Sequence, residues 1–170
     1  MPRLLSLLAA RAGALANNAE LARSAGIPNS TLVRYMALLQ TTFLLQPLPA
    51  WSRNLSKRLV RSAKTYLCDT ALLATVLGLN DPAVLVASEK LGTLLENFVV
   101  MELRKQTSWS RARPGMYHFR THTGREVDVV FETPSGDVAG VEVKASSSVR
   151  GADFNGLRHL AEVTGDLFRC

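Results

Sequence analysis

Residues 124–146 read GREVDVVFETPSGDVAGVEVKAS and contain two strand-like runs, GREVDVVFE and GVEVKAS. Because successive side chains of a β-strand point to opposite faces, the valines that flank Asp128 share one face and Asp128 lies on the other. In the second run the two valines likewise share a face, which leaves Glu142 and Lys144 on the opposite one. If the two strands pair, Asp128, Glu142 and Lys144 converge on one patch.

These three side chains suit metal-assisted phosphodiester hydrolysis. Asp128 and Glu142 supply hard oxygen ligands for Mg²⁺ or Mn²⁺, and a metal held there can polarise a phosphodiester. Lys144 can position an attacking water or offset the negative charge that grows at phosphorus. Glu96 interrupts the apolar run LLENFVVM. It is either a direct or supporting ligand of this site or an ordinary helical glutamate.

Around these runs the pattern predicts a regular alternation of helices and strands. We expect a long helix, three strands and a second helix, and DLFRC at the end has the composition of a further strand. The expected bounds are 88–107 for the long helix, 116–121, 126–132 and 138–145 for the strands, and 153–164 for the second helix. A turn at NDP, residues 80–82, separates this part from the preceding one. We therefore expect an α/β domain with a small mixed sheet over residues 81–170.

Residues 1–80 predict a winged helix-turn-helix module. Ala22, Gly26 and Leu32 have the spacing of a small residue where two helices touch, a glycine in the turn and an apolar anchor in the next helix. The expected helices cover 3–14, from a cap at Asn17 or Asn18 to Ala25, and from a cap at Asn29 or Ser30 to about Thr42. The module also fits a winged helix that binds protein, or an ordinary helical core.

The predicted DNA-binding residues lie on the third helix and on a wing. FLLQPLPAW and TYLCD would pair as a β-hairpin, and the basic stretch between them would meet phosphates. The first outward turns of the third helix would enter a major groove. The candidates are Ser30, Thr31, Arg34 and Tyr35 on the helix, and Arg53, Lys57, Arg58, Arg61 and Lys64 in the wing.

The net charge of +6 is unevenly distributed. Residues 1–64 carry nine Lys or Arg and one acid, a net +8, whereas residues 65–170 carry eleven Lys or Arg and thirteen acids, a net −2. This asymmetry indicates that the N-terminal part faces a polyanion such as DNA, with a solvated basic surface as the alternative. The content of 47% hydrophobic and 20% charged residues is that of a folded chain.

Cysteine usage favours a cytoplasmic location. Cys68 and Cys170 match no paired metal-ligand spacing, and a disulfide framework is not indicated. The first 16 residues, MPRLLSLLAARAGALA, are similar in composition to a secretory signal peptide. We interpret them instead as an amphipathic helix, because Arg11 interrupts the short apolar run. No run is long and apolar enough to span a bilayer, so we expect no membrane partner.

Taken together, the motifs resemble the PD-(D/E)xK nuclease superfamily. Glu96 on a helix, Asp128 on a strand and Glu142-x-Lys144 on the next strand follow its pattern, although Val127 stands where that superfamily has proline. The chain is more similar still to the C-terminal region of a group of prokaryotic AAA-type ATPases. Four runs carry that resemblance: PAWSRNLSKRLVRSAKTYLCDTAL, GTLLENFVVMEL, YHFRTHTGREVDVVFE and GVEVKASSSV.

The resemblance implies a restriction-endonuclease-like domain after a winged helix, and a P-loop ATPase module as the partner of both. No G-x-x-x-x-G-K-[ST] run occurs in this chain, so ATP would bind only in a module outside it. The family would also continue past Cys170, which suggests a C-terminally truncated fragment. We therefore expect a DNA-binding, Mg²⁺- or Mn²⁺-dependent endonuclease. The alternative is a non-catalytic adaptor that binds a partner protein or DNA and regulates the ATPase.

Overall fold

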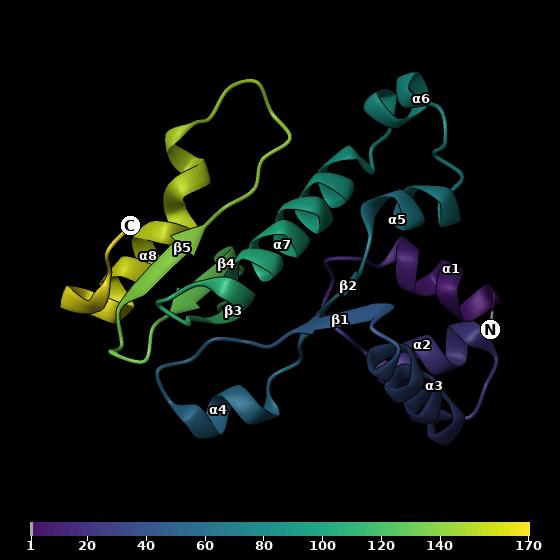
Figure 1. Ribbon diagram of the computed structural model, residues 1–170, viewed down its shortest axis with the longest axis horizontal. Helices are drawn as coiled ribbons and strands as arrows, with labels where there is room; N and C mark the ends of the chain where they lie inside the picture. The colour runs from purple at the N-terminus through teal and green to yellow at the C-terminus, as the bar shows by residue number, and fades with distance from the viewer. Residues whose placement is uncertain (1) are drawn as a thin grey trace. The chain divides into compact units, whose positions relative to one another are not determined.

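The computed structural model describes residues 2–170, apart from the side chains of Lys57 and Val60 (Figure 1). The chain divides into two compact units, each built from two segments. The first comprises Met1–Pro47 and Ser62–Phe98, and the second comprises Leu48–Arg61 and Val99–Cys170. This division differs from the predicted boundary between residues 80 and 81 in two ways. Residues 48–61 pack within the second unit, and residues 81–98 belong to the first.

The first unit begins with three helices: α1 (Pro2–Ala10), α2 (Asn18–Ala25) and α3 (Asn29–Thr41). As predicted, the Asn17 side chain caps α2 by accepting the Glu20 N–H at 3.1 Å, and Gly26 ends it in the left-handed conformation with φ of 69°. The predicted cap of α3 is wrong. Pro28 occupies that position and provides no side-chain hydrogen bond.

A small sheet follows, formed by β1 (Leu45–Leu48) and β2 (Lys64–Leu67). Gly13 has a φ of 77°, and its N–H donates to the Thr65 carbonyl at 2.8 Å. The chain after α1 thus pairs with β2 through an antiparallel bridge between Leu15 and Lys64. This pairing explains why α1 ends at Ala10 and not at residue 14.

The core of the first unit is apolar and comes mainly from α1 to α3. Leu8 and Leu32 are essentially inaccessible to solvent, and Leu73 from α5 (Thr70–Val76) joins them. α6 (Pro82–Ala87) was not expected, since NDP was interpreted as a turn. Asp81 caps α6 by accepting the Ala83 and Val84 N–H groups, and Pro82 occupies its first turn, where proline is favoured.

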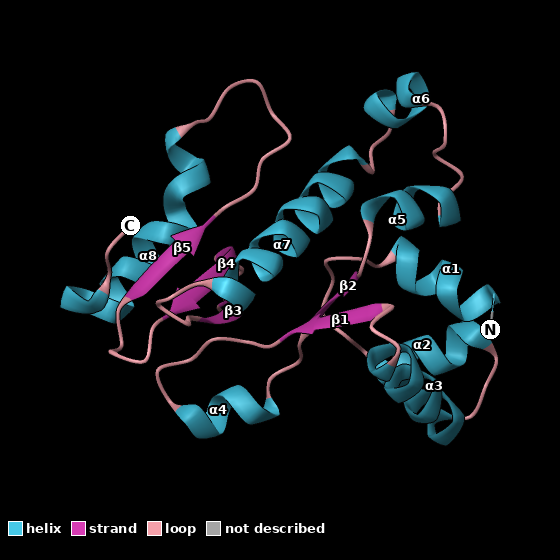
Figure 2. Cartoon of the chain, in the orientation of Figure 1, coloured by secondary structure: helices cyan, strands magenta, loops and turns pink. Residues whose placement is uncertain are grey.

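The second unit contains a three-stranded sheet (Figure 2). β3 (Gly115–Arg120), β4 (Glu126–Glu132) and β5 (Val138–Val141) are paired in that order and are antiparallel. Single parallel bridges join Ala50 to His118 and Val138 to Phe168. The prediction of a sheet with both parallel and antiparallel pairing therefore holds only through these two bridges. The bridge from Val138 to Phe168 places the DLFRC segment beside β5.

The rest of the second unit consists of helices and 3-10 turns. α7 (Leu91–Trp109) contributes its C-terminal half, and α8 (Asn155–Thr164) packs on β4 and β5 after the 3-10 turn η1 (Gly151–Phe154). A second 3-10 turn, η2 (Gly165–Leu167), follows α8. Within the segment expected to form a wing lies α4 (Leu55–Val60). The predicted hairpin loop is therefore a helix-containing connection.

The coarse prediction of an α/β protein is confirmed. Among the residues that the structure describes, none of the helices has the length and apolar character needed to cross a membrane. Cys68 and Cys170 are both free thiols.

Candidate functional site

Asp128 lies at an irregularity in β4. On β3, Tyr117 and Phe119 are two residues apart, but their partners on β4, Val130 and Val127, are three apart. β4 therefore carries one extra residue at the Asp128 position, a β-bulge of the kind that redirects side chains near sites. Strict alternation predicted that Val127 shares a face with Val129, which is wrong, because Val127 and Val130 lie in the same apolar cluster.

Glu142 and Lys144 come just after β5. That strand ends at Val141, which pairs with Val129, so Asp128 and Glu142 are the next residues along the two neighbouring strands. The prediction that the strand continues to residue 145 is therefore wrong. The chain nevertheless stays close to β4, because the Val143 N–H donates to Asp128 Oδ2 at 2.9 Å.

The three predicted side chains are brought together. Asp128 is only 7% exposed. Lys144 Nζ lies 2.6 Å from Glu142 Oε1, while Glu142 Oε2 is buried with no hydrogen-bond partner among the described residues. One carboxylate oxygen of Glu142 is thus satisfied by the lysine, whose side chain is 38% exposed, and the other oxygen is buried and unpaired among the described residues.

Burial and neighbouring charges determine the protonation behaviour of the cluster. Burial raises the pKa of Glu142, and the nearby carboxylates of Asp128 and Glu126 raise it further, although Lys144 opposes both. The hydrogen bond to Glu142 raises the pKa of Lys144. At neutral pH Lys144 is therefore a fixed cation and cannot serve as a general base.

The two carboxylates of this cluster are suitable ligands for Mg²⁺ or Mn²⁺, although they are few. Within the described residues no group of three or more His, Cys, Asp or Glu side chains could hold a metal ion. Asp128 and Glu142 offer two hard oxygen donors, and the unpaired Glu142 Oε2 is available to a cation. Mg²⁺ is commonly bound by one or two carboxylates with water and substrate phosphate completing its shell. The residues present therefore fit such an ion.

Glu96, the fourth predicted catalytic residue, belongs to the first unit. Its Oε1 accepts hydrogen bonds from Lys64 Nζ at 2.9 Å and from Tyr66 Oη at 2.7 Å. A side chain at Gly13 would come within 3.2 Å of the same carboxylate. The structure thus shows Glu96 in a local polar cluster, and its role as a metal ligand stays a prediction.

Only some of the predicted DNA-binding residues of α3 are exposed to solvent. Ser30 and Arg34 on α3 are exposed, whereas Thr31 is partly buried and Tyr35 packs partly against the core. The exposed side of α3 also carries Val33 and Leu38. Its DNA contact stays a prediction.

The wing residues require correction at two positions. Lys64 is 2% exposed and is ion-paired with Glu96, so it does not face solvent. Arg58 donates to both carboxylate oxygens of Glu132, and its guanidinium lies over the rings of Trp51 and Tyr117. These two cations are used inside the protein because unpaired buried carboxylates are costly.

The remaining wing candidates are less constrained. Arg53 and Arg61 make only long hydrogen bonds, of 3.4 and 3.5 Å, to the carbonyls of Val163 and Arg120. Both remain candidates for phosphate contact. The side chain of Lys57 lies outside the described part of the structure.

Sequence reasoning missed a concentration of positive charge in the second unit. Residues 103–125 contain five arginines, one lysine and no Asp or Glu. The net charge of −2 over residues 65–170 concealed this run, since acids on both sides of it cancel the sum. A charge count in a short sliding window would have found it.

Comparison with known proteins divides the chain into two domains. Residues 1–83 match a domain of unknown function (DUF8612), and residues 91–169 match another (DUF4143), which is often seen with AAA ATPases. These ranges differ from the two compact units, because residues 48–61 fall in the first match but pack in the second unit. No solved structure matches the chain.

Two relatives come from mycobacteria. The uncharacterized proteins Rv2008c of Mycobacterium tuberculosis and Mb2031c of Mycobacterium bovis are each 36% identical over 148 residues, covering 87% of this chain. The match covers 32% of each relative. The chain thus spans about a third of the length of the curated relatives that it matches.

Proposed function

We propose that this chain binds DNA and hydrolyses its phosphodiester bonds with a divalent metal, as the C-terminal part of an AAA-type ATPase. The observation that carries the proposal is the meeting of Asp128, Glu142 and Lys144 at the ends of β4 and β5. The match to a domain often seen with AAA ATPases supports the ATPase partner. The resemblance to PD-(D/E)xK nucleases supports the reaction.

In this proposal each residue of the cluster has a distinct task. Asp128 and Glu142 hold the cation, and the Val143 N–H fixes the orientation of the Asp128 carboxylate. A bound Mg²⁺ or Mn²⁺ supplies the positive charge that polarises the phosphodiester. Lys144, held as a cation beside Glu142, stabilises the negative charge that develops on the phosphate oxygens.

A non-catalytic adaptor is the second candidate, and one observation favours it. The ion pair between Lys144 and Glu142 balances the charge of the Glu142 carboxylate without any metal. In an adaptor this pair would be a permanent structural contact. In a nuclease, Lys144 would stay beside Glu142 and would also contact the phosphate, while Glu142 Oε2 would be the oxygen that binds the cation.

A cleavage assay separates the two candidates. The chain, alone and within the longer ATPase-containing protein, is incubated with Mn²⁺ or Mg²⁺ and linear, nicked or branched DNA. We expect cleavage that is lost in Asp128→Asn, Glu142→Gln and Lys144→Ala, by about a hundredfold or more for each. Glu162→Gln is the matched control, because its carboxylate is exposed on α8. Bound but uncut DNA with every metal would leave the adaptor as the function.

A further inference from the structure

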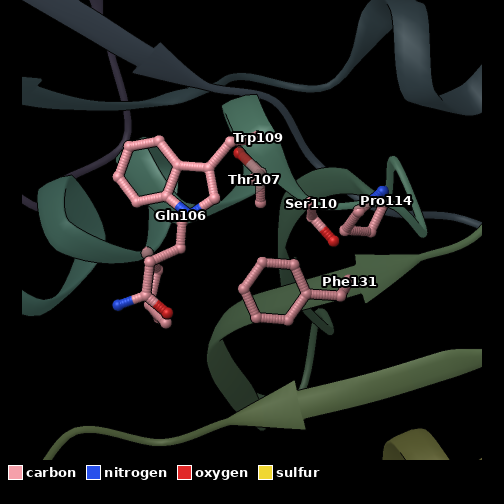
Figure 3. Close-up of a pocket in the computed structure, with 7 residues that line it drawn as sticks. Gln106, Thr107, Trp109, Ser110, Pro114 and Phe131 are labelled. Atoms are coloured by element: carbon pink, nitrogen blue, oxygen red, sulfur yellow. The ribbon is translucent and has the colours of Figure 1, made fainter.

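A pocket of about 380 Å³ lies in the second unit, within the size range of about 300–1,000 Å³ typical of ligand sites. It is formed by the C-terminal end of α7, the turn that follows and β4 (Figure 3). The aromatic side chains of Trp109 and Phe131 are among those that line it, as Figure 3 shows. Trp109 is 71% exposed, so its indole face is open to a ligand.

Two of the three polar side chains that line the pocket are not used by the protein, whereas the Thr107 hydroxyl donates to the Arg104 carbonyl. The Gln106 amide and the Ser110 hydroxyl line the pocket and make no hydrogen bond within residues 2–170. An amide has two donors and one carbonyl acceptor, which can read the edge of a planar heterocycle. The pocket therefore combines aromatic side chains with hydrogen-bonding groups that have no partner in the described part of the protein and are available to a ligand.

The charge around the pocket favours an anionic ligand. Arg111 and Arg113 are exposed and make no ion pair within the described residues. They lie in the acid-free run 103–125, within four residues of Trp109. Arg111 and Arg113 are close in sequence to the residues that line the pocket, and guanidiniums near an open aromatic pocket can bind the phosphates that adjoin a stacked base.

We propose that this pocket holds an unpaired nucleobase, with Trp109 and Phe131 providing stacking faces and Arg111 and Arg113 binding the adjoining phosphates. A base paired in a duplex exposes only its edges, so the pocket would select single-stranded or locally opened DNA. The inference rests on the proposed function only in taking a nucleic acid as the partner. It requires neither a metal nor cleavage.

The test measures binding of a fluorescently labelled short oligo(dT) and of a duplex of equal length by anisotropy, in the presence of a chelator. Trp109→Ala should weaken oligo(dT) binding about fivefold or more, the loss expected for one base–aromatic stack. Binding of the duplex should hardly change. Trp109→Phe keeps an aromatic face and should retain most of the affinity for oligo(dT).

Three further variants complete the design. Phe43→Ala removes another exposed aromatic, 72% accessible in the first unit, and should leave oligo(dT) binding unchanged. Replacing Arg111 and Arg113 together by Gln should reduce the salt dependence of oligo(dT) binding. Glu162→Gln changes an exposed carboxylate outside the pocket lining and should bind oligo(dT) like the unmodified chain. The chelator removes divalent cations, so an inactive nuclease site does not affect the result. Unchanged oligo(dT) affinity in Trp109→Ala, or an equal loss for duplex, would overturn the proposal.

Discussion

Arg58 in α4 donates from both terminal nitrogens to the carboxylate of Glu132 at the end of β4, although the two residues are 74 positions apart in sequence. The side chains are 11% and 22% exposed, and the guanidinium also lies 5.0 Å from the centre of the Tyr117 ring. Burial and a bidentate geometry make this a strong charge-assisted contact. It anchors the connection between β1 and β2 within the second unit.

Removing Arg58 should destabilise the protein. Arg58→Ala leaves the Glu132 carboxylate partly buried without its cation, and we expect a loss of about 2 kcal/mol in the free energy of unfolding. Chemical denaturation monitored by circular dichroism measures it. Arg61→Ala is the control, because its single hydrogen bond is long and should contribute less than about 0.5 kcal/mol. Equal losses in both variants would contradict the anchoring role.

A second prediction concerns the contact between α8 and the start of β4. A Cβ atom at Gly156 would collide with the carbonyl oxygen of Glu126, so Gly156→Ala must push the helix away from the strand. Overpacking of this kind costs about 1–3 kcal/mol. Gly151→Ala provides the control, since no atom lies within 4 Å of its Cβ position. A thermal midpoint that drops equally in both variants would show that the contact is looser than described.

The raised pKa of Glu142 predicts how metal binding depends on pH. A protonated carboxyl cannot hold a cation, so Mn²⁺ affinity should fall as pH falls through a pKa above the ordinary glutamate value of about 4.3. Lys144→Ala removes the cation that lowers this pKa, and the fall should begin at a higher pH. Calorimetric titration at a series of pH values measures both effects. A fall centred at or below the ordinary glutamate value would refute the assignment.

The same pKa has a consequence for stability without metal. Because the folded state binds the Glu142 proton more tightly than the unfolded state, this residue makes unfolding easier as pH rises from about 4.3 through its folded pKa. Glu142→Gln has no such proton. The difference in unfolding free energy between the two proteins should therefore change in this window and become constant above it. A constant difference at all pH values would show that burial does not shift this carboxyl.

DNA binding by the first unit can be tested at Arg34, which is exposed on α3. If α3 contacts a duplex, Arg34→Ala should weaken binding and reduce the slope of log affinity against log salt by about one. Arg3→Ala removes an exposed arginine from α1 and should have little effect. Equal effects in the two variants would indicate nonspecific attraction to a basic surface.

Local sequence patterns were sufficient for several features. Asn17 and Gly26 mark the ends of α2 because capping and left-handed turns depend on neighbouring residues alone. The bounds of β4 were predicted correctly, and the meeting of Asp128 with Glu142 followed from the pairing of two adjacent strands. Asp128 and Glu142 are close in sequence, and the antiparallel pairing of Val129 with Val141 is what makes them neighbours.

Which cations remain exposed depends on long-range packing. In the sequence, Lys64 and Arg58 cannot be distinguished from the neighbouring basic residues Arg53 and Arg61. Lys64 and Arg58 are nevertheless ion-paired, with Glu96 and Glu132, which are remote in sequence. The bulge at Asp128 likewise depends on β3, which pairs across it. The Trp109 pocket requires α7 and β4 to approach each other, so no local pattern could predict it. Burial and long-range ion pairs depend on how the chain packs, because each is determined by residues that a sequence window does not contain.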